Sequence, residues 1–345
     1  MAQSANSAAV SSQTRQDMQL RQQLQQTDPL GGAGSLQEET VSARPLSPDM
    51  GDVQIMQEKE AKPWFFLTVD TQAFYNSNVT YAESSNRVFG AWQIITTPEI
   101  GFAPRIQDEQ YSMFFPRAGF RYQFYTYAQA EPYPLAYTST VVPGGPQYTI
   151  AQQNFRVSNP YLSLGWAFSD DLYLEFSGQA NIYTSNSPSS SPANFLSEYP
   201  LAWQATWFKS FAEIQSVSIT ARASYVLANP TNFERTDNNL TFAWVTNPTR
   251  EINTQIYASF RLAKYTGLNP TAVDNPGSDL GYFNNSDRLD FQQTYGASVT
   301  WSPIEYLSLR AFISWTKSDS SVQVAQTGDF EAYNAGTGLN LIYRF

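Results

Sequence analysis

The sequence contains no cysteine and no histidine among its 345 residues, and charged residues make up only 14% of it. A chain without cysteine has no disulfide framework, which fits a protein that folds outside the cytoplasm without oxidative help. A chain without histidine cannot use Ser-His-Asp hydrolysis, because no imidazole is present to take the serine proton. A zinc site would have to be built from carboxylates alone, which is uncommon. We therefore expect no enzymatic activity, no metal and no cofactor.

Two further absences limit the partners and the mode of membrane insertion. The net charge is −10 and the sequence has no basic stripe that could neutralise phosphates, so we expect no nucleic-acid partner. No apolar run is long enough for a membrane helix. The start, Met1-Ala-Gln-Ser, lacks a charged segment followed by an apolar one. We interpret Ala2 onward as a mature N-terminus whose export signal was replaced by Met1.

Aromatic residues are abundant, at 15% of the chain, and they recur at alternate positions. The last stretch, 331–345, shows this most clearly. One face carries Tyr333, Ala335, Leu339, Leu341, Tyr343 and Phe345, and the other carries Asn334, Gly336, Gly338, Asn340 and Arg344. This alternation is typical of a β-strand that is wet on one side and apolar on the other. Closing such a strand against the first strand removes an aggregation-prone edge, and a closed barrel is the all-β form that a membrane tolerates.

The ending Leu339-Asn-Leu341-Ile-Tyr343-Arg-Phe345 resembles the C-terminal signal of bacterial outer-membrane β-barrels, which ends in Phe with aromatic residues at alternate positions. The resemblance implies a location in the bacterial outer membrane and contact with membrane lipid and lipopolysaccharide. It also implies that the barrel assembly machinery of the outer membrane recognises the signal, here Leu339, Leu341, Tyr343 and Phe345.

From Pro63 onward the same alternation repeats, with turn residues between the segments. The expected strands are 64–75, 88–103, 113–127, 153–168, 172–184, 201–208, 214–227, 239–246, 251–265, 289–301, 306–316 and 331–345. Short connections alternate with longer ones. The short ones are 169–171, 209–213, 247–251 and 302–305, and the longer ones are 128–150, 185–199, 229–238, 265–288 and 317–331. The 104–112 connection is the exception, because it lies on the periplasmic side but is longer than a tight turn. An even number of strands, with short periplasmic turns and longer outer loops, predicts an all-β fold. The expected architecture is a closed antiparallel up-and-down transmembrane barrel of about 12 strands over residues 63–345. The alternative is a large soluble β-sandwich or propeller.

Residues 1–62 differ in composition, because they are rich in Gln, Ser and Ala and contain no aromatic residue. We expect a largely disordered N-terminal periplasmic arm, within which 11–26 could form one short polar helix. Two functional alternatives remain open: an arm that contacts a periplasmic partner, and a helix that enters the barrel as a plug.

If the apolar face of every strand points outward, the polar face collects ten charged residues. A charge facing lipid near the midplane would cost a few kcal/mol, so we expect these residues to point inward. The predicted pore-lining residues are Asp70, Glu99, Arg117, Arg121, Glu175, Arg222, Arg261, Asp290, Arg310 and Arg344. Arg121, Arg222 and Arg310 fall near mid-height, with Asp70 close to the same level, and these arginines would favour anions. The alternative is that the charges pair with one another and fill a narrow barrel.

These features predict an outer-membrane pore of porin type for passive diffusion of small hydrophilic solutes, with a preference for anions. The alternative function is a non-conducting barrel that serves as an anchor or subunit of an envelope complex through its N-terminal arm and outer loops. Both hypotheses share one architecture, so the architecture cannot decide between them.

Overall fold

The computed structural model describes residues 64–345 except 80–89, 105, 108–112, 129–153, 170, 187–193, 213, 250, 267–287 and 322–328. The predicted N-terminal arm and its helix lie outside the described residues. Within the described part of the chain, no helix is long and apolar enough to cross a membrane.

The described residues form an all-β architecture with one short 3₁₀ helix, η3 (Thr231–Phe233). The strands are β1 (Phe65–Asn76), β2 (Ala91–Phe102), β3 (Ile106–Gln107), β4 (Met113–Tyr127), β5 (Phe155–Ser169), β6 (Leu172–Gln179), β7 (Asn181–Ser185), β8 (Asn194–Ala212), β9 (Gln215–Asn229), β10 (Arg235–Thr246), β11 (Ile252–Tyr265), β12 (Leu289–Ile304), β13 (Leu307–Ser320) and β14 (Phe330–Arg344).

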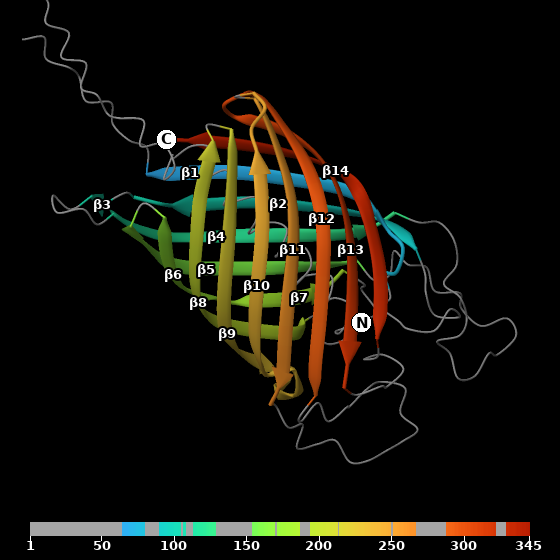
Figure 1. Ribbon diagram of the computed structural model, residues 1–345. Helices are drawn as coiled ribbons and strands as arrows, with labels where there is room; N and C mark the ends of the chain where they lie inside the picture. Colours follow the sequence, from blue (N-terminus) through green and yellow to red (C-terminus); the bar gives the residue numbers. More distant parts are fainter. Residues whose placement is uncertain are drawn as a thin grey trace, which may run out of the picture.

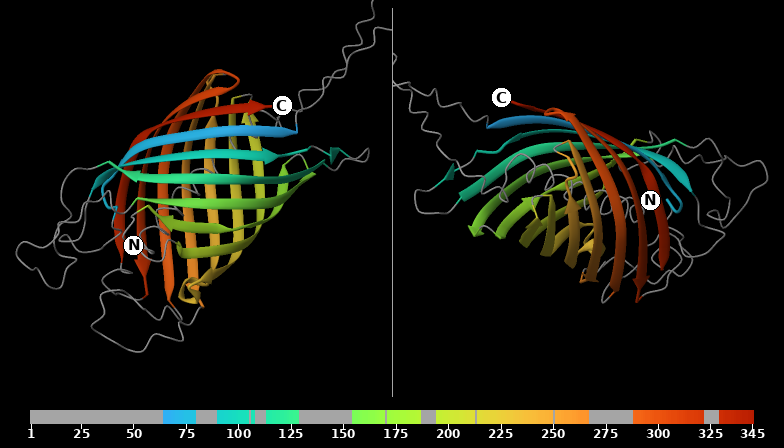
Figure 2. Two further views of the ribbon diagram at one scale, coloured as in Figure 1. Left: turned by 180° about the vertical axis from the view of Figure 1, so that it is seen from behind. Right: turned by 45° about the horizontal axis from the view of Figure 1, so that its top comes forward.

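The strands close into a barrel in which every spanning strand pairs antiparallel with its neighbours. β14 pairs with β1 over eleven residue pairs, from Phe66 opposite Arg344 to Asn76 opposite Asn334. The C-terminus therefore lies beside the start of β1, as Figure 1 shows. Seen from behind, β14, β1, β2, β4 and β5 cross in front of the strands of the opposite wall (Figure 2).

β6 and β7 are two halves of one spanning strand, which leaves twelve spanning strands once the two-residue β3 is set aside. The interruption falls at Ala180. Pro160 of β5 lies opposite Ala180, and Pro200 of β8 lies opposite the adjacent Gln179. Proline has no backbone N–H to donate, so it removes ladder hydrogen bonds on both sides of this point. The prediction of twelve strands in a closed up-and-down barrel is confirmed.

Burial alternates along the strands and assigns the two faces of the wall. In β1, Phe66, Thr68, Asp70, Gln72 and Phe74 are buried, whereas Phe65, Leu67 and Tyr75 are exposed. In β2, Gln93, Thr97 and Glu99 are buried, whereas Trp92, Ile94 and Ile100 are exposed. The exposed face is apolar and aromatic, as a lipid-facing belt requires, so the expected facing of these strands is confirmed.

The short connections occur where the sequence predicts them, between Ser169 and Leu172, Ala212 and Gln215, Thr246 and Ile252, and Ile304 and Leu307. Three of the longer connections are shorter than expected. β8 begins at Asn194, η3 and the start of β10 occupy 231–238, and β13 and β14 extend to Ser320 and from Phe330. The expected bounds were wrong for two reasons. The start of β10 and the end of β13 are runs of polar residues, which give no contrast in hydrophobicity. The start of β8 places the apolar Leu196 on the buried face, which disturbs the expected alternation. Of the 104–112 connection, the structure describes β3, which pairs with β4.

Deletion of Tyr343–Phe345 is expected to abolish assembly into the membrane. The deletion removes the antiparallel backbone hydrogen bonds between Phe65 and Phe345 (3.0 and 3.1 Å) and the stacked contact of their rings, whose centroids are 6.0 Å apart. It also leaves the edge of β1 partly unpaired. Heat-modifiable migration in gels measures the folded barrel. Deletion of residues 2–50 should leave that migration unchanged, and normal migration of the C-terminal deletion would contradict the expectation.

Candidate functional site: the inner wall of the barrel

The structure places the ten predicted charged residues on the inward-facing positions of their strands. Asp70, Glu99, Arg121 and Asp290 are buried, and Arg344 is exposed at the end of β14. The other five are half-buried: Arg117, Glu175, Arg222, Arg261 and Arg310. Their inward orientation follows from the alternation, and their role in lining a pore stays a prediction.

One charged cluster joins β2, β4 and β5 in the half of the barrel nearer the short turns. Glu99 accepts from Arg117 Nη2 at 2.7 Å and from Arg121 Nε at 3.1 Å. The Tyr161 hydroxyl donates to Glu99 Oε1 at 2.5 Å and accepts from Arg117 Nε at 3.0 Å. A Cβ at Gly119 would lie 2.6 Å from that hydroxyl, so glycine is required for this approach. Arg121 is therefore held by a carboxylate, although the sequence suggested Asp70 as its neighbour.

A second charged cluster crosses the inner wall near the loop end, over β8, β10 and β11. Arg235 lies 2.5 Å from Glu198 and 3.0 Å from Asp237, and Asp237 lies 2.7 Å from Arg261. The Arg235 and Glu198 side chains are only 3% and 2% exposed. Such a chain of alternating charges satisfies each buried ion through hydrogen bonds and ties three strands together.

The cluster continues to β12 and β13 through one aromatic ring. The Tyr265 ring lies 5.8 Å from the Arg235 guanidinium carbon and 4.6 Å from that of Arg288, which places it within cation–π distance of both. Arg288 pairs with Asp290 at 2.5 Å, and the Ser320 hydroxyl donates to Asp290 at 2.7 Å. The loop end of this wall is thus cross-linked from β8 to β13.

The predicted mid-height grouping of Arg121, Arg222 and Arg310 is not brought together as one cluster. The three residues lie on β4, β9 and β13, which are separated around the barrel. Arg310 lies 5.2 Å from the Phe312 ring, and Asp70 accepts a hydrogen bond from Gln72 Nε2 at 2.9 Å. The sequence predicted correctly that these side chains face inward. Which residues are neighbours around the barrel depends on strand order and tilt, which the sequence pattern does not show.

A continuous row of hydroxyl side chains runs around the inner wall from β8 to β13. Each member lies directly opposite the next on the neighbouring strand, so the row follows the hydrogen-bonding direction. Three of the five pairings are hydrogen-bonded at 3.1–3.2 Å. The row consists of Thr206, Thr220, Thr241, Ser259, Thr294 and Thr316. The next row toward the loops, which includes Gln204, Arg222, Asn239, Arg261 and Gln292, is also polar. These two adjacent rows therefore offer hydrogen-bonding groups across this half of the inner wall.

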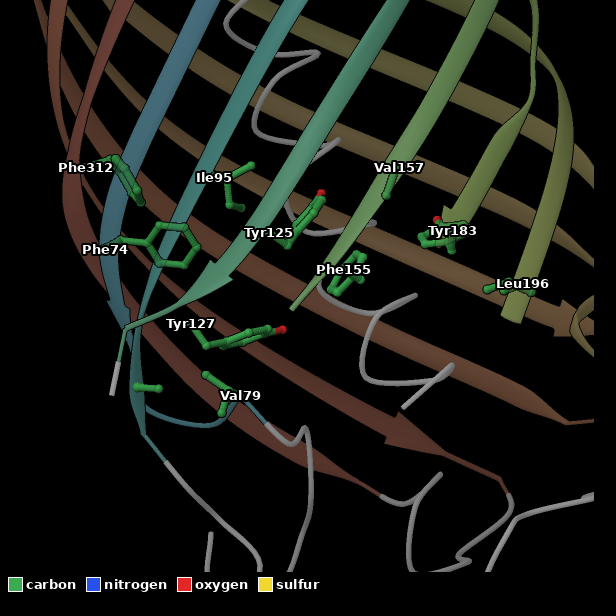
Figure 3. Packing of buried hydrophobic residues seen from close by; sticks show 11 residues of the cluster. Phe74, Val79, Ile95, Tyr125, Tyr127, Phe155, Val157, Tyr183, Leu196 and Phe312 are labelled. Carbon is green, nitrogen blue, oxygen red and sulfur yellow. The ribbon is translucent and has the colours of Figure 1, made fainter. Parts of the chain in front are cut away.

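The opposite half of the inner wall is apolar near the loops, which corrects the expectation of a polar inner face on every strand. The Tyr125 and Phe155 rings are stacked, with centroids 4.3 Å apart, and Phe155 also contacts Tyr183. Figure 3 shows these residues with Phe74, Ile95 and Phe312 from neighbouring strands. Tyr125, Phe155 and Tyr183 are each at most 2% exposed. The alternation predicts that Tyr125 and Tyr183 face inward, but it missed Phe155. At the start of β5 the buried face is apolar and Arg156 lies on the exposed face, which is the reverse of the expected pattern.

Sequence reasoning missed four inward charged residues: Glu198, Arg235, Asp237 and Arg288. The first three were assigned to loops because the expected strands began at 201 and 239. Extending the parity of the strands would have found them, since Arg235, Asp237 and Asn239 are all at odd positions and Glu198 shares parity with Ala202. Arg288 directly precedes β12 and shares parity with Asp290.

No protein-family model matches the chain, and no curated protein matches it. Solved outer-membrane barrels do. An outer membrane channel from Pseudomonas putida F1 superimposes with a TM-score of 0.51 at 7% identity, over 85% of this chain and all of that one. The NanC porin gives a TM-score of 0.37 at 8% identity, over 79% of this chain and 98% of that one. The KdgM porin, solved with oligogalacturonate, gives a TM-score of 0.36 with the same identity and coverage. The similarity is one of architecture, that of a bacterial outer-membrane β-barrel.

Proposed function

We propose that the protein is an outer-membrane channel for passive diffusion of small hydrophilic solutes, with a modest preference for anions. The observation that carries the proposal is the polar half of the inner wall, where the hydroxyl row and its neighbouring amide and guanidinium row lie side by side. Such groups replace the hydrogen bonds that a hydrophilic solute loses on leaving water.

The charge balance of the inner wall supports the anion preference. The whole chain carries a net charge of −10, but the inward positions of the described strands and Arg288 carry eight arginines against six carboxylates, a net charge of +2. These residues are Arg117, Arg121, Arg222, Arg235, Arg261, Arg288, Arg310 and Arg344, and Asp70, Glu99, Glu175, Glu198, Asp237 and Asp290. Fixed charges of one sign on a pore wall raise the local concentration of the opposite ion.

The double change Arg222→Gln and Arg310→Gln should lower the anion-to-cation permeability ratio. A unit charge about 8 Å from a permeating ion contributes about 0.5 kcal/mol in water, which corresponds to a change on the order of twofold. Reversal potentials under a salt gradient in planar bilayers measure the ratio. The effect should diminish at high salt, because the screening length falls to about 3 Å at 1 M.

The double change Lys209→Gln and Lys317→Gln provides the control. It also removes two positive charges, but both lysines lie on the exposed face, Lys209 near the short turns and Lys317 near the loops. Its reversal potential should match that of the parent. An equal shift in both double variants would assign the selectivity to the general surface potential. A parent protein that gives no conductance would exclude the channel.

The alternative function, a non-conducting barrel that anchors or joins an envelope complex, is favoured by the inward aromatic residues near the loops, because buried side chains there narrow the lumen. This alternative would be supported if the parent protein gave no conductance in bilayers and a partner were recovered through the N-terminal arm. We propose no enzymatic role. Recognition of the C-terminal residues by the assembly machinery also remains a proposal.

A further inference from the structure

A groove of about 810 Å³ crosses the exposed, lipid-facing side of the wall. It follows the hydrogen-bonding direction from β4 to β12, so that it crosses strand after strand. At β5 and β6 its lining residues lie toward the short turns, at β9 they lie in mid-strand, and at β12 they lie toward the loops. The groove therefore runs obliquely across the hydrocarbon depth.

Three alanines form the centre of the groove. Ala205 of β8 lies directly opposite Ala221 of β9, and Ala223 is the next exposed residue on β9. Outward positions of a membrane barrel are generally occupied by larger apolar side chains, so adjacent alanines leave a depression in the belt.

Aromatic pairs border this alanine floor on both sides. The Phe176 and Trp203 rings lie 4.5 Å apart on the β6–β8 side. The Phe260 and Phe291 rings are stacked at 6.5 Å on the β11–β12 side. Large rings beside small residues make a shaped, apolar channel, and at this depth only lipid or another membrane-embedded surface can reach it.

One exposed cation lies at the loop end of the groove. Leu262 and Phe291 face each other across β11 and β12, and Lys264 with Leu289 is the next outward-facing pair toward the loops. Lys264 is thus about 7 Å beyond the lining residue Leu262. Lys264 is exposed and forms no ion pair with another described residue, whereas Lys209 and Lys317 pair with Asp171 and Asp319. A lysine ammonium at the membrane surface is well suited to a lipid phosphate.

We propose that this groove is a lipid-binding site for the phosphorylated glycolipid of the outer leaflet, lipopolysaccharide. One acyl chain lies in the groove, over the floor formed by Ala205, Ala221 and Ala223, and a phosphate pairs with Lys264. The continuity of the groove with the lipid-facing belt supports an acyl chain as its occupant. The position of Lys264 at the loop end supports a lipid of the outer leaflet.

Native mass spectrometry of the full chain, purified from outer membranes in a mild detergent, tests the proposal. The parent should retain a glycolipid of identifiable mass. Ala223→Phe, which fills the groove, and Lys264→Gln, which removes the charge, should each reduce its retention about tenfold. The matched controls are Ala311→Phe and Lys317→Gln. Ala311 is an exposed alanine on β13 outside the groove, and Lys317 is a lysine near the loops that already pairs with Asp319. Both controls should retain the lipid, and all variants should show the heat-modifiable migration of a folded barrel.

Several results would overturn the proposal. A parent that retains no lipid, or equal retention in all five proteins, excludes a specific site. Retention of a phospholipid in place of the glycolipid would reject the outer-leaflet assignment. A dimer that disappears in Ala223→Phe would assign the groove to a second copy of the chain. The test requires no conductance, so its outcome is independent of the proposed channel.

Discussion

Replacing Arg235 with methionine is expected to lower the free energy of unfolding by about 3–5 kcal/mol, because the change removes one partner from a buried charged cluster. Arg235 contacts both Glu198 and Asp237, and the side chain of Glu198 is only 2% exposed. Without the guanidinium, Glu198 retains the Tyr183 hydroxyl at 3.2 Å as a donor but loses its counter-ion. Denaturant titration of the barrel folded into lipid vesicles measures the free energy.

Two comparisons separate the buried charge from simple loss of packing. Lys209→Met breaks the ion pair with Asp171, in which the Lys209 and Asp171 side chains are 50% and 43% exposed. This change should lower the free energy of unfolding by less than about 1 kcal/mol. The double change Glu198→Leu and Arg235→Met removes both charges and should recover much of the loss. If the double variant is less stable than Arg235→Met alone, an uncompensated charge is not the cause.

The second large effect is expected on the lipid-facing side. Leu162→Arg and Ile256→Arg should each destabilise the barrel by about 2–4 kcal/mol, since the new charge would face hydrocarbon. Leu162 and Ile256 are 64% and 59% exposed, and they lie in the interior of β5 and β11. The same titration in vesicles measures the loss, and a bilayer of longer acyl chains should increase it.

The matched substitution is Ser163→Arg, one residue along β5 on the inward face. There the guanidinium can reach water or polar groups of the inner wall, so its cost should be much smaller. A slip of one residue in register exchanges the two faces of a strand. Equal costs at Leu162 and Ser163 would therefore show that the facing of β5 is wrong.

The sequence predicted the architecture because the environment acts on every second residue. A strand between lipid and lumen must place apolar side chains at one parity, and residues such as Leu162, Ile256 and Leu341 record that requirement locally. The same rule placed Glu99, Arg117 and Arg222 on the inward face. It failed where contrast disappears. The first residues of β8 and β10, which hold Glu198, Arg235 and Asp237, were assigned to loops, and Phe155 was missed because the apolar face of β5 turns inward at its start.

The sequence by itself therefore determined the number of strands, their facing and the closure of β14 on β1, because each depends on a two-residue period that can be counted along the chain. Only the tertiary structure decided which side chains meet. Glu99 with Arg117, Arg235 with Glu198, and the alanine floor beside Trp203 and Phe260 all join residues from different strands. Their contacts depend on register, tilt and curvature of the wall, which arise from packing of the whole barrel and leave no periodic signal in any one strand.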